Sequence, residues 1–144
     1  MIQQIPFFTA KQFITIDDDR SSLFMCKVII NRTFADMPVV AYQDPQRAVD
    51  YFETVFAANP VETVVMLDIN MPELSGWDVL DRFFLLDEEV KKYIRVIMLS
   101  SSIDPGDKQR AMDHPCVSDY LEKPLSHVKF GRVASGVCAY SFQL

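Results

Sequence analysis

The chain has 144 residues, a net charge of −6 at pH 7 and a hydrophobic content of 49%, which suit a single globular domain with one core. The acidic balance argues against direct nucleic-acid binding, which needs Lys and Arg to displace counterions from phosphates. No apolar run approaches the roughly 20 residues that span a bilayer. The first ten residues carry no positive charge and include Pro6, so they make a poor secretion signal. We therefore expect a cytoplasmic protein that does not bind membranes.

Four short apolar blocks predict strands, and a weaker fifth block follows them. The blocks are residues 13–16, 39–42, 64–67 and 96–99, with Tyr120 and Leu121 as the fifth. Each block is continuously apolar rather than alternating, which is typical of strands in a parallel sheet that is covered on both faces.

Segments of helical length follow the five blocks. Helices are predicted over residues 21–34, between Asp44 and Asn59, over residues 75–86 and 105–112, and after Pro124. The second helix should bury Ala48, Tyr51, Phe52 and Val55, and the third should bury Val79, Leu80, Phe83 and Phe84. The fourth has few apolar residues and should be loosely held, and the fifth contains Gly131 and Gly136. The alternation predicts an α/β fold with a doubly wound parallel sheet.

Polar residues follow four of these strands directly. Asp17, Asp18 and Asp19 follow the first, Asp68 to Asn70 the third, Ser100 to Ser102 the fourth, and Glu122 to Pro124 the fifth. Ligands of open α/β sheets bind outside the carboxyl ends of the strands. These side chains are therefore expected to share one crevice.

Carboxylates a few Å apart repel each other by roughly 4 kcal/mol per pair at an effective dielectric near 20. A hard divalent cation would relieve this repulsion, and oxygen ligands without His or Cys favour Mg²⁺ over zinc. Lys123 and the serine hydroxyls do not suit a metal. They suit an anion, such as a phosphoryl group, held beside the cation.

The segments FITIDDD, MLDINMPELSGWDVL, VIMLSSS and YLEKPL resemble, in this order, the response-regulator receiver domain of two-component signalling. The resemblance covers roughly residues 11–135. It implies a flavodoxin-like (βα)5 fold whose five-stranded parallel sheet has the order 2-1-3-4-5. We expect residues 1–10 to form an N-terminal extension and residues 11–144 to form the receiver, without an output domain.

The resemblance also implies a role for each site residue, with Asp68 as the phosphoacceptor. Asp17, Asp18, Asp68 and the backbone carbonyl of Asn70 would bind Mg²⁺ or Mn²⁺. Ser100 matches the hydroxyl that binds the phosphoryl oxygen, Tyr120 the aromatic switch residue, and Lys123 the lysine paired with the acceptor. Pro72 and Gly76 would shape the loop after the third strand, and the Lys123–Pro124 peptide bond resembles one that is cis in receivers.

The implied function is phosphorelay signal transduction. A histidine kinase or a histidine phosphotransfer protein would donate the phosphoryl group to Asp68. Ser100 would then move inward and Tyr120 would turn from solvent toward the core. This would reshape the face formed by the fourth helix, fifth strand and fifth helix for an unidentified downstream protein.

Two alternatives stay open. An aspartate-nucleophile phosphohydrolase would use similar groups, but it needs a second acid where this chain has Asn70. A receiver that binds partners without being phosphorylated would have the same fold. Two departures from the family pattern, the long stretch from Leu86 to Arg95 and the glycine-containing last helix with its apolar tail, lie away from the expected site.

Overall fold

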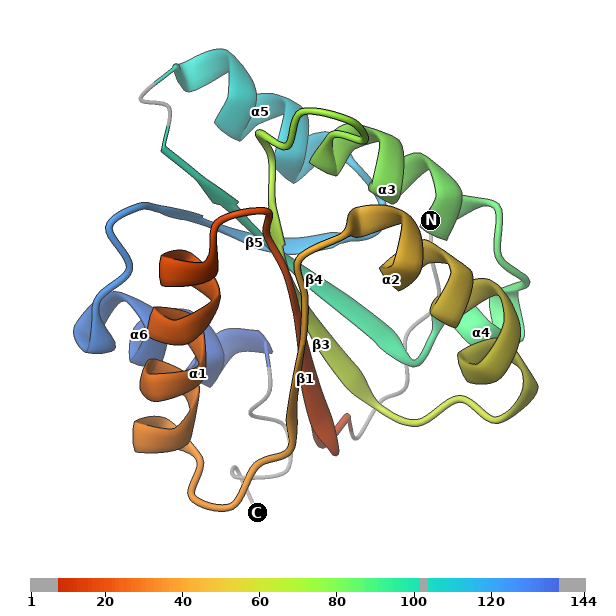
Figure 1. Cartoon of the computed structure of the whole chain (residues 1–144), viewed down its shortest axis with the longest axis horizontal. Coiled ribbons are helices and arrows are strands. Elements are labelled where there is room, and N and C mark those ends of the chain that lie inside the picture. Colours follow the sequence, from red (N-terminus) through yellow and green to blue (C-terminus); the bar gives the residue numbers. More distant parts are fainter. Residues whose placement is uncertain (1–7, 102–103, 138–144) are drawn as a thin grey trace.

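A five-stranded parallel sheet forms the centre of the molecule. In the computed structural model, which describes residues 8–101 and 104–137, the strand order is β2-β1-β3-β4-β5, with helices on both faces (Figure 1). The strands are β1 (Gln12–Ile16), β2 (Val39–Tyr42), β3 (Thr63–Asp68), β4 (Ile94–Ser100) and β5 (Val117–Glu122). The predicted fold class and strand order are therefore confirmed.

Six α-helices and one π-helical turn lie between or after the described strands. They are α1 (Arg20–Thr33), α2 (Pro45–Tyr51), η1 (Phe52–Phe56), α3 (Gly76–Phe84), α4 (Glu88–Lys91), α5 (Pro105–Asp113) and α6 (His127–Val137). The side chains of Asp19, Asp44, Ser75 and Asp104 cap four of the helices by accepting backbone N–H groups. The short helix α4 lies in the long stretch from Leu86 to Arg95 that the sequence showed. The fourth and fifth helices predicted from the sequence therefore correspond to α5 and α6.

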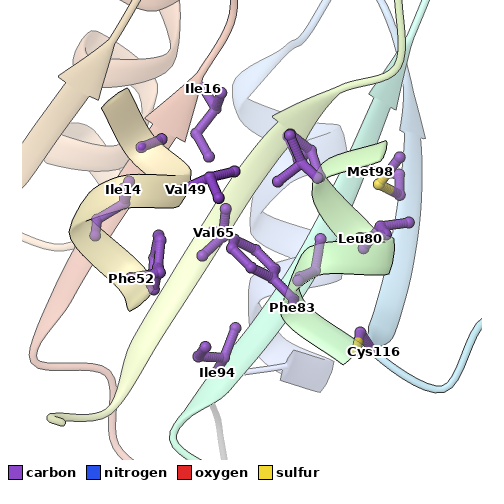
Figure 2. Packing of buried hydrophobic residues seen from close by; sticks show 14 of the residues in the cluster. Ile14, Ile16, Val49, Phe52, Val65, Leu80, Phe83, Ile94, Met98 and Cys116 are labelled. Atoms are coloured by element: carbon purple, nitrogen blue, oxygen red, sulfur yellow. The ribbon is translucent and has the colours of Figure 1, made fainter. Parts of the chain in front are cut away.

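The core consists of two apolar layers, one on each face of the sheet. Successive strand residues point to opposite faces, so Val65 and Leu67 pack under α2 and α3 while Val64 and Met66 pack under α1 and α6. Figure 2 shows the first layer, where Phe52 and Phe83 meet near Val65, with 4.7 Å between the two ring centroids. The central strands are buried on both sides, as predicted.

One predicted buried position is wrong by one residue. Val55 was expected inside, but it is 65% exposed and Phe56 is buried at 1%. The helix that begins at Pro45 changes to π-helical geometry at Phe52, and a π-helical turn contains more residues than an α-helical one. The extra residue moves the buried stripe from Val55 to Phe56.

Two other burial predictions are also wrong. Strand β2 is at the edge of the sheet, and Val40 and Ala41 are exposed, so this apolar block is not covered on both faces. Phe84 is 45% exposed at the last position of α3. The Lys91 ammonium lies 4.5 Å from the centre of the Phe84 ring and Lys91 itself is buried, so this aromatic ring covers a lysine rather than the core.

Helix α6 forms despite its two glycines, because Phe130, Val133, Ala134 and Val137 bury one face of it. Its last residue, Val137, accepts a hydrogen bond from the buried side chain of Arg95. Tyr140, Phe142 and Leu144 of the predicted apolar tail lie outside the described residues. None of the helices in residues 8–101 and 104–137 is both long and apolar enough to cross a membrane.

Candidate functional site

Two buried carboxylates meet at the carboxyl ends of neighbouring strands. Asp17 directly follows β1 and Asp68 ends β3, and these strands pair so that Ile16 lies opposite Leu67. Asp17 is 2% exposed and Asp68 is 4% exposed, whereas Asp18 is exposed. One carboxylate oxygen from each of the three residues lies within 4.8 Å of the other two. The acidic cluster predicted from the strand ends is therefore present.

The Lys123 ammonium lies between the two buried carboxylates. Its Nζ is 2.8 Å from Asp17 Oδ2 and 3.2 Å from Asp68 Oδ1, and it is 3.3 Å from Ser22 Oγ. The Lys123 backbone N–H donates to Ser100 O at 2.8 Å, which fixes the loop after β5 against the end of β4. The Lys123–Pro124 peptide bond is cis, as the resemblance implied.

Burial and the local charges shift the pKa values of Asp68 and Lys123. Burial and the charge of Asp17 raise the pKa of Asp68 from 3.8 to about 6, although Lys123 partly offsets them. Burial alone would lower the pKa of Lys123, but the hydrogen bond and charge of Asp17, together with Asp68, raise it. The ammonium is therefore retained at neutral pH, where the Asp68 carboxylate is mainly ionised.

The raised pKa of Asp68 predicts a pH dependence of stability. A carboxyl group that holds its proton more tightly in the folded state stabilises the fold below its unfolded pKa, and this contribution is lost as the pH rises through the folded pKa. With EDTA present, the unfolding free energy of wild type minus that of Asp68→Asn should decrease as the pH rises from 3.8 to about 6. Urea unfolding of both proteins across this range measures the difference, and parallel pH profiles would contradict it.

The loop after β3 passes very close to its own strand end at Gly76. The Gly76 N–H donates to Ile69 O at 2.9 Å, and a Cβ atom at this position would lie 2.5 Å from Asp68 O. Pro72 is exposed and lines a small pocket beside Asp18. Glycine is thus required at position 76, because the loop is folded directly against the backbone of Asp68.

The oxygen atoms of the acidic cluster fit a magnesium ion. Ligands of one Mg²⁺, each bound at about 2.1 Å, lie at most roughly 4 Å apart, and the three carboxylate oxygens lie within 4.8 Å of one another. All three side chains offer oxygen, and exposed Asp18 leaves access for water. Asn70, whose carbonyl is the fourth expected ligand, is exposed two residues after Asp68.

Ser100 and Tyr120 lie on neighbouring strands, but Tyr120 is not where it was expected. Ser100 is the last residue of β4 and is fully buried. Tyr120 was expected to face solvent before phosphorylation, yet it is 7% exposed and belongs to the core layer that includes Ala111 and Cys116. Its hydroxyl has no hydrogen-bond partner within residues 8–101 and 104–137. The Tyr120 ring is therefore already packed in the core layer that includes Ala111 of α5.

The two described cysteines are buried and free. Burial raises the pKa of Cys26 to about 12 and that of Cys116 to about 11. Both thiols therefore stay protonated at neutral pH and are poor nucleophiles, which suits residues that pack in the core. Cys138, the third cysteine, lies outside the described residues.

Two solved structures that resemble this fold are those of response regulators. A response regulator receiver protein from Dyadobacter fermentans matches with a TM-score of 0.75 and 27% identity, over 86% of this chain and 94% of its own. A two-component response regulator from Cytophaga hutchinsonii matches with a TM-score of 0.78 and 28% identity, over 88% of this chain and 96% of its own.

Curated relatives match over a shorter length. The polar-differentiation response regulator DivK of Brucella ovis is 33% identical over 67 residues, which are 46% of this chain and 52% of DivK. The chain thus spans about half the length of the curated relatives it matches first. The response regulator receiver domain family matches residues 13–132. The chain therefore belongs to the response regulator receiver family, whose members act as signalling switches.

Proposed function

We propose that this receiver accepts a phosphoryl group on Asp68 from a histidine kinase or a histidine phosphotransfer protein. The observation that carries the proposal is the position of Asp68 at the end of β3, where its buried carboxylate lies close to both the acidic pair and the Lys123 ammonium. A buried carboxylate with a raised pKa and a specific cationic partner is typical of a reactive group.

In the proposed reaction an oxygen of Asp68 attacks the phosphorus atom of a phosphohistidine. The new O–P bond forms as the N–P bond to the imidazole breaks, and the imidazole nitrogen retains the electron pair. Asp17, Asp18, Asp68 and the Asn70 carbonyl would hold Mg²⁺, which when bound supplies positive charge next to the phosphoryl oxygens. Lys123 is already 3.2 Å from Asp68, so its ammonium can follow the transferred group.

The product is an acyl phosphate that adds about −1.5 to −2 charge at the end of β3. Ser100 ends the adjacent strand β4 and would donate its hydroxyl to a phosphoryl oxygen. Because Tyr120 is already buried beside α5, the switch would stabilise the inward ring rather than rotate it from solvent. The surface of α5, β5 and α6 would then signal to a downstream protein.

The proposed site of action is the cytoplasm. Cys26 and Cys116 are free, which suits a reducing compartment. The proposed phosphohistidine donor would be met in the same compartment. The acidic net charge of −6 supports a protein partner rather than direct contact with nucleic acid.

The test is intact mass spectrometry after incubation with a small acyl-phosphate donor. Wild type with Mg²⁺ should gain the mass of one phosphoryl group, whereas wild type in EDTA and Asp68→Asn with Mg²⁺ should gain none. A matched control is Asp78→Asn, because this carboxylate caps α3 and does not belong to the acidic cluster. No gain in wild type, at any Mg²⁺ concentration, would favour a receiver that binds its partners without phosphorylation.

A further inference from the structure

Within residues 8–101 and 104–137, three acceptors surround the Lys123 ammonium, two carboxylates and one hydroxyl. Ser22 Oγ is the third, at 3.3 Å from Nζ, after Asp17 at 2.8 Å and Asp68 at 3.2 Å. An ammonium group has three N–H donors and no acceptor. Ser22 therefore completes the set of partners of Lys123 as a neutral acceptor.

The Ser22 hydroxyl is oriented by Asp19, the third aspartate of the sequence run and the N-cap of α1. Lys123 can only donate, so Ser22 Oγ accepts from it and its own O–H is available to Asp19 Oδ2, 3.4 Å away. Asp19 is itself fixed as the N-cap of α1, where it accepts from Ser21 N at 2.9 Å. The backbone N–H of Asp19 also donates to Asp17 Oδ1 at 2.9 Å. The first turn of α1 is thus linked to the acidic pair on one side and to Lys123 on the other.

The three contacts of Lys123 differ in what happens to them in the proposed reaction. Asp17 and Asp68 belong to the cluster that would hold a metal ion, so their negative charge is shared with any cation that binds there. Ser22 lies outside that cluster. Its contact with Lys123 is the one that need not change when the charge around Asp68 changes.

We propose that Ser22, oriented by Asp19, is a positioning residue that holds the Lys123 ammonium toward Asp68, and thereby strengthens its contact with the transferred phosphoryl group. The inference rests on the proposed function. Without Ser22, the ammonium keeps its shorter contact with Asp17 and is displaced from the phosphoryl position. Because the Lys123 side chain is 21% exposed, water replaces part of the lost contact, and the expected effect is a change of about three- to tenfold.

The test measures binding of beryllofluoride, a phosphoryl mimic, in the presence of Mg²⁺ by titration calorimetry. Ser22→Ala should weaken beryllofluoride binding about three- to tenfold. Ser21→Ala is the matched control, since Ser21 is the preceding residue of the same helical turn and is exposed. Ser22→Thr keeps the hydroxyl and should restore binding. Its added methyl has room in the pocket of about 450 Å³ that Ser22 and Lys123 line.

Binding of Mg²⁺ alone separates positioning from general damage. It should stay within about twofold of wild type in all three variants, because none of them removes a candidate metal ligand. Equal beryllofluoride affinity of Ser22→Ala and Ser21→Ala, or failure of Ser22→Thr to restore binding, would overturn the inference while leaving the proposed function intact. A wild-type protein that binds Mg²⁺ but no beryllofluoride would overturn the proposed function, and the inference with it.

Discussion

Replacing Gly76 with alanine is expected to lower the unfolding free energy by about 3 kcal/mol or more. The new Cβ would lie 2.5 Å from Asp68 O and 2.9 Å from Ile69 Cα. Both are backbone atoms, so no side-chain rotation relieves the overlap. Because Asp68 ends β3 and Ile69 follows it, the loop or the strand end would have to move, and the acidic cluster would be distorted with it.

The chain contains a control in which the same change has the opposite expected effect. A Cβ at Gly131 would have no heavy atom within 4 Å, and Gly131 lies inside α6. Alanine in a helix interior is favoured over glycine by up to about 1 kcal/mol. Urea unfolding should therefore show Gly76→Ala well below wild type and Gly131→Ala equal to it or above it. A Gly76→Ala protein as stable as wild type would show that the loop does not require the close approach.

Replacing Lys123 with methionine is expected to slow phosphorylation of Asp68 by about 100-fold or more, because removing one preorganised cationic partner of a developing phosphoryl charge typically has an effect of this size. Methionine retains much of the side-chain volume but provides no ammonium for Asp17 and Asp68, which Lys123 now contacts at 2.8 Å and 3.2 Å. The loss of Lys123 also removes the charge that holds the pKa of Asp68 down. A larger fraction of the carboxyl would then be protonated and unreactive near neutral pH.

The rate is measured as the initial mass gain with a small acyl-phosphate donor and Mg²⁺. Lys27→Met is the matched control, since Lys27 is exposed on α1, and it should react at the wild-type rate. If part of the rate reduction arises from a further rise in the pKa of Asp68, the rate of Lys123→Met should approach that of wild type as the pH increases. A Lys123→Met protein that reacts as fast as wild type would exclude a role for the ammonium in the transfer.

The sequence predicted which strand-end carboxylates lie together, because parallel strands place their carboxyl ends at one edge. Asp17, Asp68 and Ser100 each stand at the end of a continuous apolar block, so their approximate positions depended only on strand order and register. The glycine at position 76 could be recognised from the resemblance. Its physical reason, the 2.5 Å approach to Asp68 O, required coordinates.

The errors arose where neighbouring structure changed a periodic pattern. A helical period predicted Val55 inside, but the π-helical turn at Phe52 buries Phe56 instead. Phe84 has the spacing of an inward residue but contacts Lys91, which belongs to a short helix that the sequence did not reveal. Ser22 could not have been singled out from Ser21, because only the path of the loop after β5 decides which hydroxyl meets Lys123.

The measurement that most directly tests the account is the location of the phosphoryl group by borohydride reduction and peptide mass spectrometry. An aspartyl phosphate is reduced to homoserine, so the modified residue is marked permanently. After treatment with a small acyl-phosphate donor and Mg²⁺, homoserine should appear at position 68, in the peptide that contains the end of β3, and it should be absent in EDTA. Homoserine at position 17 or 18, or at no position in a protein that binds Mg²⁺, would contradict the assignment of Asp68 as the phosphoacceptor.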